Sequence, residues 1–260
     1  MNIQSLVPDD LWEAIEPILP KEPPKPKGGR PRVPNRAALG GIIFVLRTGC
    51  PWRLLPKELG CGNGTTCWRR LRDWQEAGVW ERLHTTVLNW LGDEAAIDWS
   101  RASVDSLSVR AKRGARRPGR TRPTAASLAP STTSSSTRGA SPLAVRLSAA
   151  NAHDATQLLP LVDQIPSIIG PRGRPGRPRK RPAKLHADKA YDSSPLRRAL
   201  RARSITPRIA RRGIDSSERL GRHRWVVERT RRGCSVAAGS GCGTSGERTC
   251  SRACCTWRAG

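Results

Sequence analysis

Three acidic side chains lie on segments that read as strands or helices, where carboxylates could hold a metal ion. Asp105 ends a strand-like run, Asp188 lies at the acidic end of a second short strand-like segment, and Glu228 lies in a helix-like or strand-like segment further on. Carboxylate oxygens are the ligands that Mg²⁺ prefers. An aspartate at the end of a strand is, taken alone, more often a cap or turn residue, so these residues need support from the surrounding sequence.

Histidine and cysteine do not offer a comparable site. The eight cysteines form no CxxC pair, and the four histidines are scattered along the chain. Cys50, Cys61 and Cys67 lie in an apolar, helix-like region, whereas the other five follow residue 233. This spacing argues against both a zinc site and a disulfide framework.

The charge of the chain indicates its partner. Lys and Arg number 47 against 21 Asp and Glu, which gives a formal net charge of +26 over 260 residues. Such a chain repels itself unless a polyanion shares its charge, so nucleic acid is the leading partner, although a GC-rich genome also contributes arginine codons. No apolar run reaches the about 18 residues that a membrane span needs, and the N-terminus does not read as a signal peptide. We therefore expect no membrane partner and a cytoplasmic, nucleoid-associated location.

The elements that must position these residues fall into two regions, and the first, residues 1–94, is predicted to be helical. A helix is expected over residues 1–20, followed by a Pro/Gly-rich basic linker at 20–34. Apolar residues at helical spacing then predict helices from Asn35 to Gly49, over 67–78 and from Val79 onward. The predicted caps and core tryptophans of this region are Asp9 or Asp10, Asn35, Thr65 or Thr66, and Trp12, Trp52, Trp68, Trp74 and Trp80.

Basic residues of this first region are candidates for DNA contact. Helices, a Gly-containing turn and a basic helix with Arg69, Arg70 and Arg72 make a helix-turn-helix-like module, which favours DNA binding over an ordinary helical bundle with a wet arginine face. The linker, which contains Arg30 and Arg32, is either an arm lying on phosphates or a plain solvated connection.

The second region, residues 95–230, alternates strands with helices, which predicts an α/β domain. Strand-like segments end at Asp105 and cover 142–151, 185–192 and 205–210, and helices are expected over 156–165 and 195–204. Residues 170–184 are basic and of low complexity, so they are expected to be disordered or wrapped on DNA.

Several strings of this sequence, in their order along the chain, resemble the DDE transposases of bacterial insertion sequences. The resemblance covers residues 6–112 and 142–230 and implies a helical N-terminal domain followed by an RNase-H-like core. The strings are GGRPR, FVLRTGCPWRLLP, CWRRLRDWQEAGVWERL, VDSLSVRA, ADKAYD and RWVVERT.

The resemblance also implies roles for single residues. Asp105, Asp188 and Glu228 match the three catalytic carboxylates; Asp105 would bridge two Mg²⁺ ions, with Mn²⁺ as a substitute, and each of the others would hold one. Two such ions stabilise the charge that builds on the attacking and leaving oxygens of a phosphodiester. Lys189 and Arg224 are implied on the DNA path, the partners are double-stranded element ends and target DNA, and a homodimer is expected.

The sequence departs from the family in two places. Residues 113–141 are rich in Ser, Thr, Pro and Arg where the family has its second core strand, and residues 231–260 lack an apolar stripe. Read from the third base of each codon, with Thr as ACN and Ser as TCN, residues 131–137 give two residues from Tyr/His/Asn/Asp, three from Leu/Phe/Ile/Val and one from the first set. Such a sequence is typical of the strand that the family has here, which indicates a frameshift. Read from the third codon base, the tail likewise gives the amphipathic segment expected after Glu228.

We therefore expect residues 113–141 to be irregular, residues 231–260 to form a disordered tail, and the chain to be an impaired transposase. The alternatives are a catalytically dead DNA-binding remnant of a transposase and a basic structural protein without any site. Mg²⁺-dependent nicking of the terminal DNA of the element separates the first interpretation from the second, and sequence-specific retention of that DNA separates the second from the third.

Overall fold

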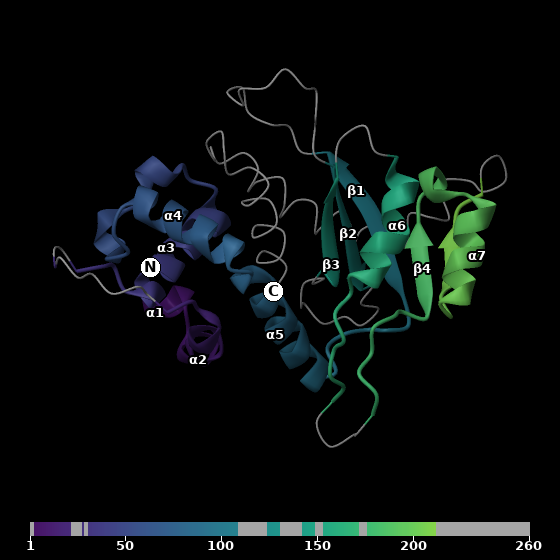
Figure 1. The fold of residues 1–260 in the computed structure, drawn as a ribbon, viewed down its shortest axis with the longest axis horizontal. Helices are drawn as coiled ribbons and strands as arrows, with labels where there is room; N and C mark the ends of the chain where they lie inside the picture. Colours follow the sequence, from purple (N-terminus) through teal and green to yellow (C-terminus); the bar gives the residue numbers. More distant parts are fainter. Residues whose placement is uncertain are drawn as a thin grey trace.

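The computed structural model of the chain describes residues 3–21, 28, 31–108, 124–130, 142–148, 153–171 and 176–211. These residues form an N-terminal group of helices and a five-stranded sheet with helices packed on it (Figure 1). The expected mixed α/β class is confirmed. Among the described residues, no helix combines the length and the apolar character that a membrane span requires.

Short helices around one apolar core make up the N-terminal part. Its elements are α1 (Ile3–Leu6), α2 (Asp9–Ile15), η1 (Glu16–Ile18), α3 (Asn35–Thr48), η2 (Trp52–Leu54), η3 (Lys57–Leu59), α4 (Gly64–Glu76) and α5 (Val79–Asp93). Trp52, Trp74 and Trp80 are buried in this core, and Trp12 and Trp68 pack against it while partly exposed. The expectation that the tryptophans of this part lie inside is therefore confirmed for three of them and met in part for two.

Proline corrects the predicted start of the chain. The single helix expected over residues 1–20 is divided at Pro8, because the residue before a proline is disfavoured in the α conformation. Pro8 and Pro34 precede α2 and α3, so Asp9, Asp10 and Asn35 lie within the first turns instead of capping them.

The remaining caps also differ in part from the predictions. Asn63 caps α4, because its Oδ1 accepts the backbone N–H of Thr66 at 2.8 Å, so the prediction of Thr65 or Thr66 as the cap is wrong. An amide oxygen at this position satisfies a backbone donor that the helix itself leaves free. Gly49 ends α3 in the left-handed conformation as predicted, with φ of 72°.

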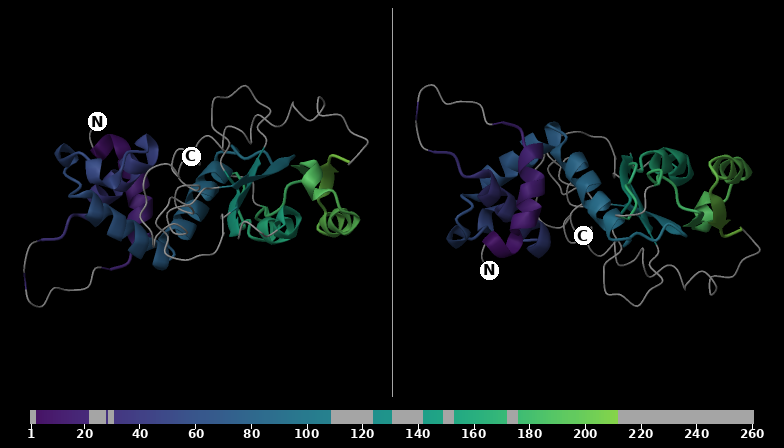
Figure 2. Two further views of the ribbon diagram at one scale, coloured as in Figure 1. Left: turned by 90° about the horizontal axis from the view of Figure 1, so that it is seen from above. Right: turned by 90° about the horizontal axis from the view of Figure 1, so that it is seen from below.

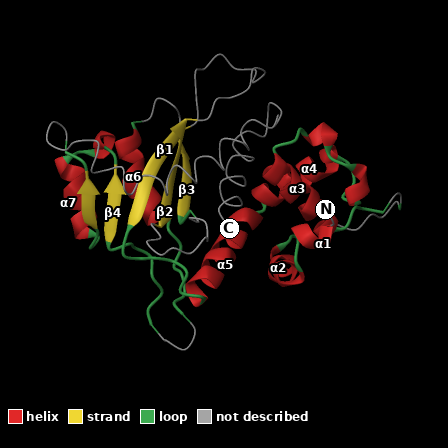
Figure 3. Ribbon diagram, turned by 180° about the vertical axis from the view of Figure 1, so that it is seen from behind, coloured by secondary structure: helices red, strands yellow, loops and turns green. Residues whose placement is uncertain are grey.

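The sheet orders its strands β3-β2-β1-β4-β5. The strands are β1 (Ala102–Ser108), β2 (Thr124–Pro130), β3 (Ala144–Ser148), β4 (Lys184–Ala187) and β5 (Thr206–Ile209). β2 is antiparallel to β1 and β3, whereas β4 is parallel to β1 and β5. The connecting helices are α6 (Asp154–Asp163), η4 (Lys189–Tyr191) and α7 (Ser194–Ala202). Seen from behind, the strands lie in front of α6 and α7 (Figure 3).

Strand β2 corrects the prediction that residues 113–141 are irregular. Residues 124–130 pair along the whole length of β1 and also with β3. The prediction weighed apolar side chains, but a ladder between two neighbouring strands is made by backbone groups. The rest of the segment lies outside the described residues, including residues 131–137, which were read above in a second frame. The tail 231–260 also lies outside them.

Helix α5 joins the two parts of the molecule. Its first half contributes Trp80 and Leu83 to the N-terminal core, and its second half contributes Leu88 to the core beneath the sheet. The views from above and below both place α5 between the helices and the sheet (Figure 2). This helix therefore fixes the helical part relative to the strands that carry the candidate site.

Candidate active site and nucleic-acid interface

The pairing of β1 with β4 brings two of the predicted carboxylate residues to one place. The two strands are parallel neighbours, and their register pairs Ala102 with Leu185 and Ser103 with His186. Two residues after this pair, Asp105 lies within β1 and Asp188 directly follows β4. The prediction that these two residues occupy neighbouring strands is confirmed; their catalytic role stays a prediction.

The turn after β4 holds Asp188 in a defined backbone conformation. The Asp188 carbonyl accepts the N–H of Tyr191 at 3.0 Å, which forms the 3-10 turn η4. Tyr191 is 2% exposed and anchors this turn in the core beneath the sheet. Lys189, the first residue of η4, is half-buried beside Asp188.

An ion pair that sequence reasoning missed fastens the far end of this turn. The Arg197 guanidinium donates from Nε and Nη2 to Asp192 Oδ1 at 2.9 and 2.7 Å, and Nη2 also donates to the Ile209 carbonyl at 2.9 Å. Both charged side chains are mostly shielded from solvent. The pair therefore ties the Asp188 turn to α7 and to the end of β5. The signal in the sequence was an arginine five residues after a second aspartate of ADKAYD.

The donor chemistry of this place fits a hard cation. Asp105 and Asp188 provide carboxylate oxygens, which suit Mg²⁺ or Mn²⁺. Within the described part of the chain, no group of three His, Cys, Asp or Glu side chains gathers to hold a metal. The third predicted carboxylate, Glu228, lies outside the described residues, together with Arg224.

A groove in the helical part brings together three of the arginines that were predicted to bind DNA. Arg32 of the linker and Arg69 and Arg70 of α4 line it with Lys57, and its volume is about 1010 Å³. We call these four residues the basic groove. The linker is not a loose connection at this point, because Val33 packs so closely on Gly62 that an added Cβ there would come within 2.8 Å of it. Arg30 lies outside the described residues.

Arg72 does not line the basic groove. Its guanidinium donates from Nε and Nη2 to Asp73 Oδ1 at 3.1 and 2.8 Å, and it lies over the ring of Trp68 at 5.6 Å from the centroid. Its charge is partly balanced by Asp73 and Glu76. Asp73 itself lines the groove, so Arg72 lies beside the groove and shares its charge with an acidic residue there.

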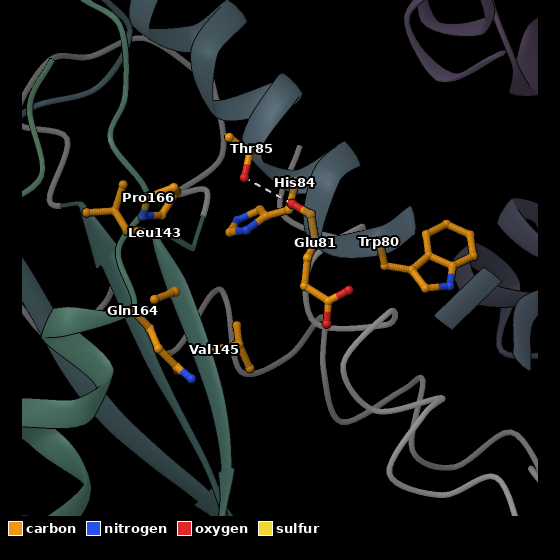
Figure 4. Close-up of a pocket in the computed structure, with 9 residues that line it drawn as sticks. Trp80, Glu81, His84, Thr85, Leu143, Val145, Gln164 and Pro166 are labelled. Carbon is orange, nitrogen blue, oxygen red and sulfur yellow. Dashed lines mark hydrogen bonds between the residues drawn. The ribbon is translucent and has the colours of Figure 1, made fainter. Parts of the chain in front are cut away.

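A smaller cavity of about 190 Å³ lies where α5 meets β3 (Figure 4). His84 Nε2 lies 2.8 Å from the Pro142 carbonyl oxygen, across this contact. A neutral histidine can donate to that carbonyl only if its single ring proton is on Nε2. Burial lowers the pKa of His84 below its ordinary value, an effect opposed by the Pro142 carbonyl and by Glu81. A neutral histidine therefore links the helical part to the edge of the sheet.

Comparison with known proteins gives matches over both parts of the chain. Residues 7–84 match the model of a family described as a putative transposase of the IS4/5 family, and residues 92–233 match that of the transposase DDE domain. No solved structure is significantly similar to this chain.

Three relatives have curated sequences. An uncharacterized 16.2 kDa protein of insertion element IS402 from Burkholderia cepacia is 57% identical over 136 residues, which are 51% of this chain and 91% of the relative. A putative transposase for IS402 from the same organism is 54% identical over 89 residues, 34% of this chain and 41% of the relative. An uncharacterized protein of Sinorhizobium fredii is 36% identical over 112 residues, 42% of this chain and 82% of the relative.

Proposed function

This chain belongs to the DDE transposases of the IS4/5 family, and from that membership we propose that it binds the DNA ends of an insertion element and cuts and joins them in a Mg²⁺-dependent reaction. The observation that carries the proposal is the register that brings Asp105 and Asp188 to neighbouring positions of two parallel strands. The strand order with an antiparallel β2 supports an RNase-H-like core around them.

In the proposed mechanism, Asp105, Asp188 and Glu228 would hold the metal ions. Bound Mg²⁺ supplies stabilisation of the charge on the attacking and leaving oxygens of the phosphodiester. Asp188 depends on its turn for position, since its carbonyl closes η4 and the Asp192–Arg197 pair fastens the other end. Lys189 is the cation nearest to it in the chain, and we assign it a contact with the phosphate backbone near the cleaved bond.

The helical part is proposed to hold the element end. Arg32, Arg69 and Arg70 converge on the basic groove, and cations that converge on a groove suit a duplex backbone. We place α4 against the DNA as the second helix of a helix-turn-helix-like module. Because an element has two ends, we also propose that two copies of the chain act together, in the cytoplasm and at the nucleoid where the DNA lies.

A second candidate function, a DNA-binding remnant without catalysis, is favoured by the C-terminal sequence. The match to the DDE family ends at residue 233, and residues 234–260 contain five of the eight cysteines and no apolar stripe. Since β2 is present, the argument for impaired activity rests on the segment that should continue after Glu228. A carboxylate whose supporting helix is not fixed by packing loses the positioning on which catalysis depends.

The two functions are separated by one experiment on the full chain. A labelled duplex with the terminal DNA of the element, taken from the flanks of the gene, is incubated with the protein in EDTA, Ca²⁺ or Mg²⁺. Retention in EDTA and nicking in Mg²⁺ that Asp105→Asn and Asp188→Asn abolish would support the transposase. Retention without nicking would support the remnant, and no retention of terminal DNA over a scrambled duplex would contradict both.

A further inference from the structure

A short cationic segment lies apart from the basic groove and from the predicted carboxylates. Residues 176–181, which we call the basic strap, have the sequence Gly-Arg-Pro-Arg-Lys-Arg, and all six are exposed. A cationic run of this kind is usually no more than a solvated surface. The contacts and the location of the basic strap distinguish it from such a solvated surface.

Backbone hydrogen bonds fix the strap to the rest of the molecule. Ile168 and Arg179 exchange two of them, each N–H donating to the other carbonyl at 2.9 Å. The next residue of the loop, Ile169, donates its N–H to Asn89 Oδ1 of α5 at 3.1 Å. Just after the strap, the N–H of Ala183 donates to the Trp99 carbonyl at 2.8 Å. The strap is therefore held at its middle and beyond its end, which lowers the entropy lost when it binds a partner.

The charge of the strap is not cancelled by neighbouring acids within the described residues. Asp163 is the carboxylate that interacts with it, and Asp163 already accepts two hydrogen bonds from Arg203, at 3.1 and 2.9 Å. The Arg203 guanidinium, with smaller contributions from Arg181 and Lys180, lowers the pKa of Asp163. Among the described residues, Arg177, Arg179 and Lys180 form no ion pair. Arg181 has a structural contact, since it donates to the Arg203 carbonyl at 3.4 Å.

The strap lies at the opposite end of the sheet from the predicted active site. It leads into the start of β4, and Asp188 follows the end of that strand, about 13 Å away for four residues in extended conformation. In Figure 1, β4 points upward, so the chain enters this strand from below and leaves it at its upper end. Cations at this end are therefore placed for phosphates other than the ones that Lys189 would contact.

We propose that the basic strap is a further DNA-binding surface, which holds the phosphate backbone of a double-stranded segment away from the bond that is cut. The inference rests on the proposed function, in that DNA is the polyanion on which a transposase acts. Arginine forks match phosphate oxygens, and each neutralised phosphate releases counterions. Phosphate oxygens are the same along every duplex, so binding through the phosphate backbone does not depend on sequence.

The test uses the full chain and a labelled 30-base-pair duplex of scrambled sequence in EDTA, so that neither cleavage nor a terminal repeat contributes. The variant Arg177→Ala/Arg179→Ala/Lys180→Ala removes three strap charges and leaves the backbone bridge intact. We expect its affinity for the duplex to fall roughly tenfold at moderate salt, and the slope of log affinity against log salt to become shallower by about 2–3. The variant Arg177→Lys/Arg179→Lys keeps the charge and should keep most of that slope.

A matched control removes the same net charge from another exposed surface. Arg198→Ala/Arg201→Ala/Arg208→Ala changes α7 and β5, and none of these arginines has an ion pair among the described residues. A strap variant and a control variant that lose the same affinity would overturn the proposal, since net charge alone would explain the loss. If the unaltered chain binds no duplex at all, the proposed function fails; if it binds and the strap variant binds equally well, only the strap inference fails. Thermal melting of each variant separates lost binding from lost folding.

Discussion

Asp105 and Asp188 lie at the same level of two neighbouring parallel strands. The pairing of Ser103 with His186 sets this level, because each aspartate follows two residues after its member of this pair. A slip of one residue would move the alternating side chains of a strand to the other face. Residues 83 positions apart in the sequence are therefore brought together by strand register, and the turn after β4 determines how firmly the second one is held.

The Asp192–Arg197 pair should stabilise this turn and the fold. In Arg197→Ala, a mostly buried carboxylate loses its partner and the Ile209 carbonyl loses a donor, so we expect unfolding to become easier by about 2–3 kcal/mol. Urea unfolding measures the change. The control is Arg198→Ala, the exposed neighbour on the same helix, which should stay within about 0.5 kcal/mol of the unaltered chain. Equal effects of the two changes would contradict the assigned role of the pair.

The basic groove predicts unequal effects for adjacent arginines of α4. Arg69→Ala/Arg70→Ala removes two charges from the groove lining and should weaken retention of the element end by roughly tenfold or more at low salt, because two phosphate contacts are lost. Arg72→Ala should change retention less, since Arg72 does not line the groove and its charge is partly balanced by Asp73 and Glu76. Fluorescence anisotropy with terminal and scrambled duplexes measures both. A larger loss in Arg72→Ala would place the DNA on the other face of α4.

Sequence periodicity was sufficient to predict the positions of most helices and strands. The apolar spacing of α3, α4 and α5 predicted buried stripes because those side chains have one large core to fill. Strand β3 was predicted from alternation, and β1, β4 and β5 were predicted as short strands. However, β1 continues past Asp105 to Ser108, and the strand predicted over 185–192 ends at Ala187. Strand β2 was missed, since Ala, Ser and Thr carry little apolar signal and the backbone ladder leaves none.

The candidate site was predictable only as far as local patterns reach. Asp105 and Asp188 could be named from their strings, but the register that aligns them depends on packing between distant segments. The Asp192–Arg197 pair and the separation of Arg72 from the groove depend on which way neighbouring side chains turn. The predicted caps of α2 and α3 were wrong for a related reason, because the geometry of Pro8 and Pro34 decided where these two helices begin.

Close packing at Gly64 predicts a large loss of stability on adding one methyl group. A Cβ at Gly64 would overlap the Trp52 carbonyl oxygen, and that backbone cannot move without shifting the loop ahead of α4. Gly64→Ala should therefore cost about 3 kcal/mol of unfolding free energy or more. Gly170→Ala is the control, since nothing lies within 4 Å of its added Cβ. Denaturant titration should leave the control nearly unchanged, and a tolerated Gly64→Ala would contradict the described approach of Trp52 to α4.

The contact between α5 and β3 predicts a pH dependence of stability. Burial lowers the pKa of His84 below its ordinary value of 6.5, whereas the Pro142 carbonyl and Glu81 oppose the shift. As the pH falls through 6.5, the unfolded chain takes up a proton at this position before the folded chain does. Stability is therefore full above about pH 6.5 and is lost progressively as the pH falls toward the lowered pKa of the folded state.

Substitution at His84 isolates this contribution from the other titrating groups. His84→Gln offers a neutral amide that can still donate to the Pro142 carbonyl, so its melting temperature should fall less than that of the unaltered chain between pH 7.5 and pH 5. Thr85→Ala is the control, because it changes the neighbouring side chain of α5 in the same cavity and removes no titratable group. It should keep the full pH dependence. If His84→Gln melts with the same pH dependence as the unaltered chain, protonation of His84 is not what weakens the contact, and the link between the helical part and the sheet must be insensitive to that charge.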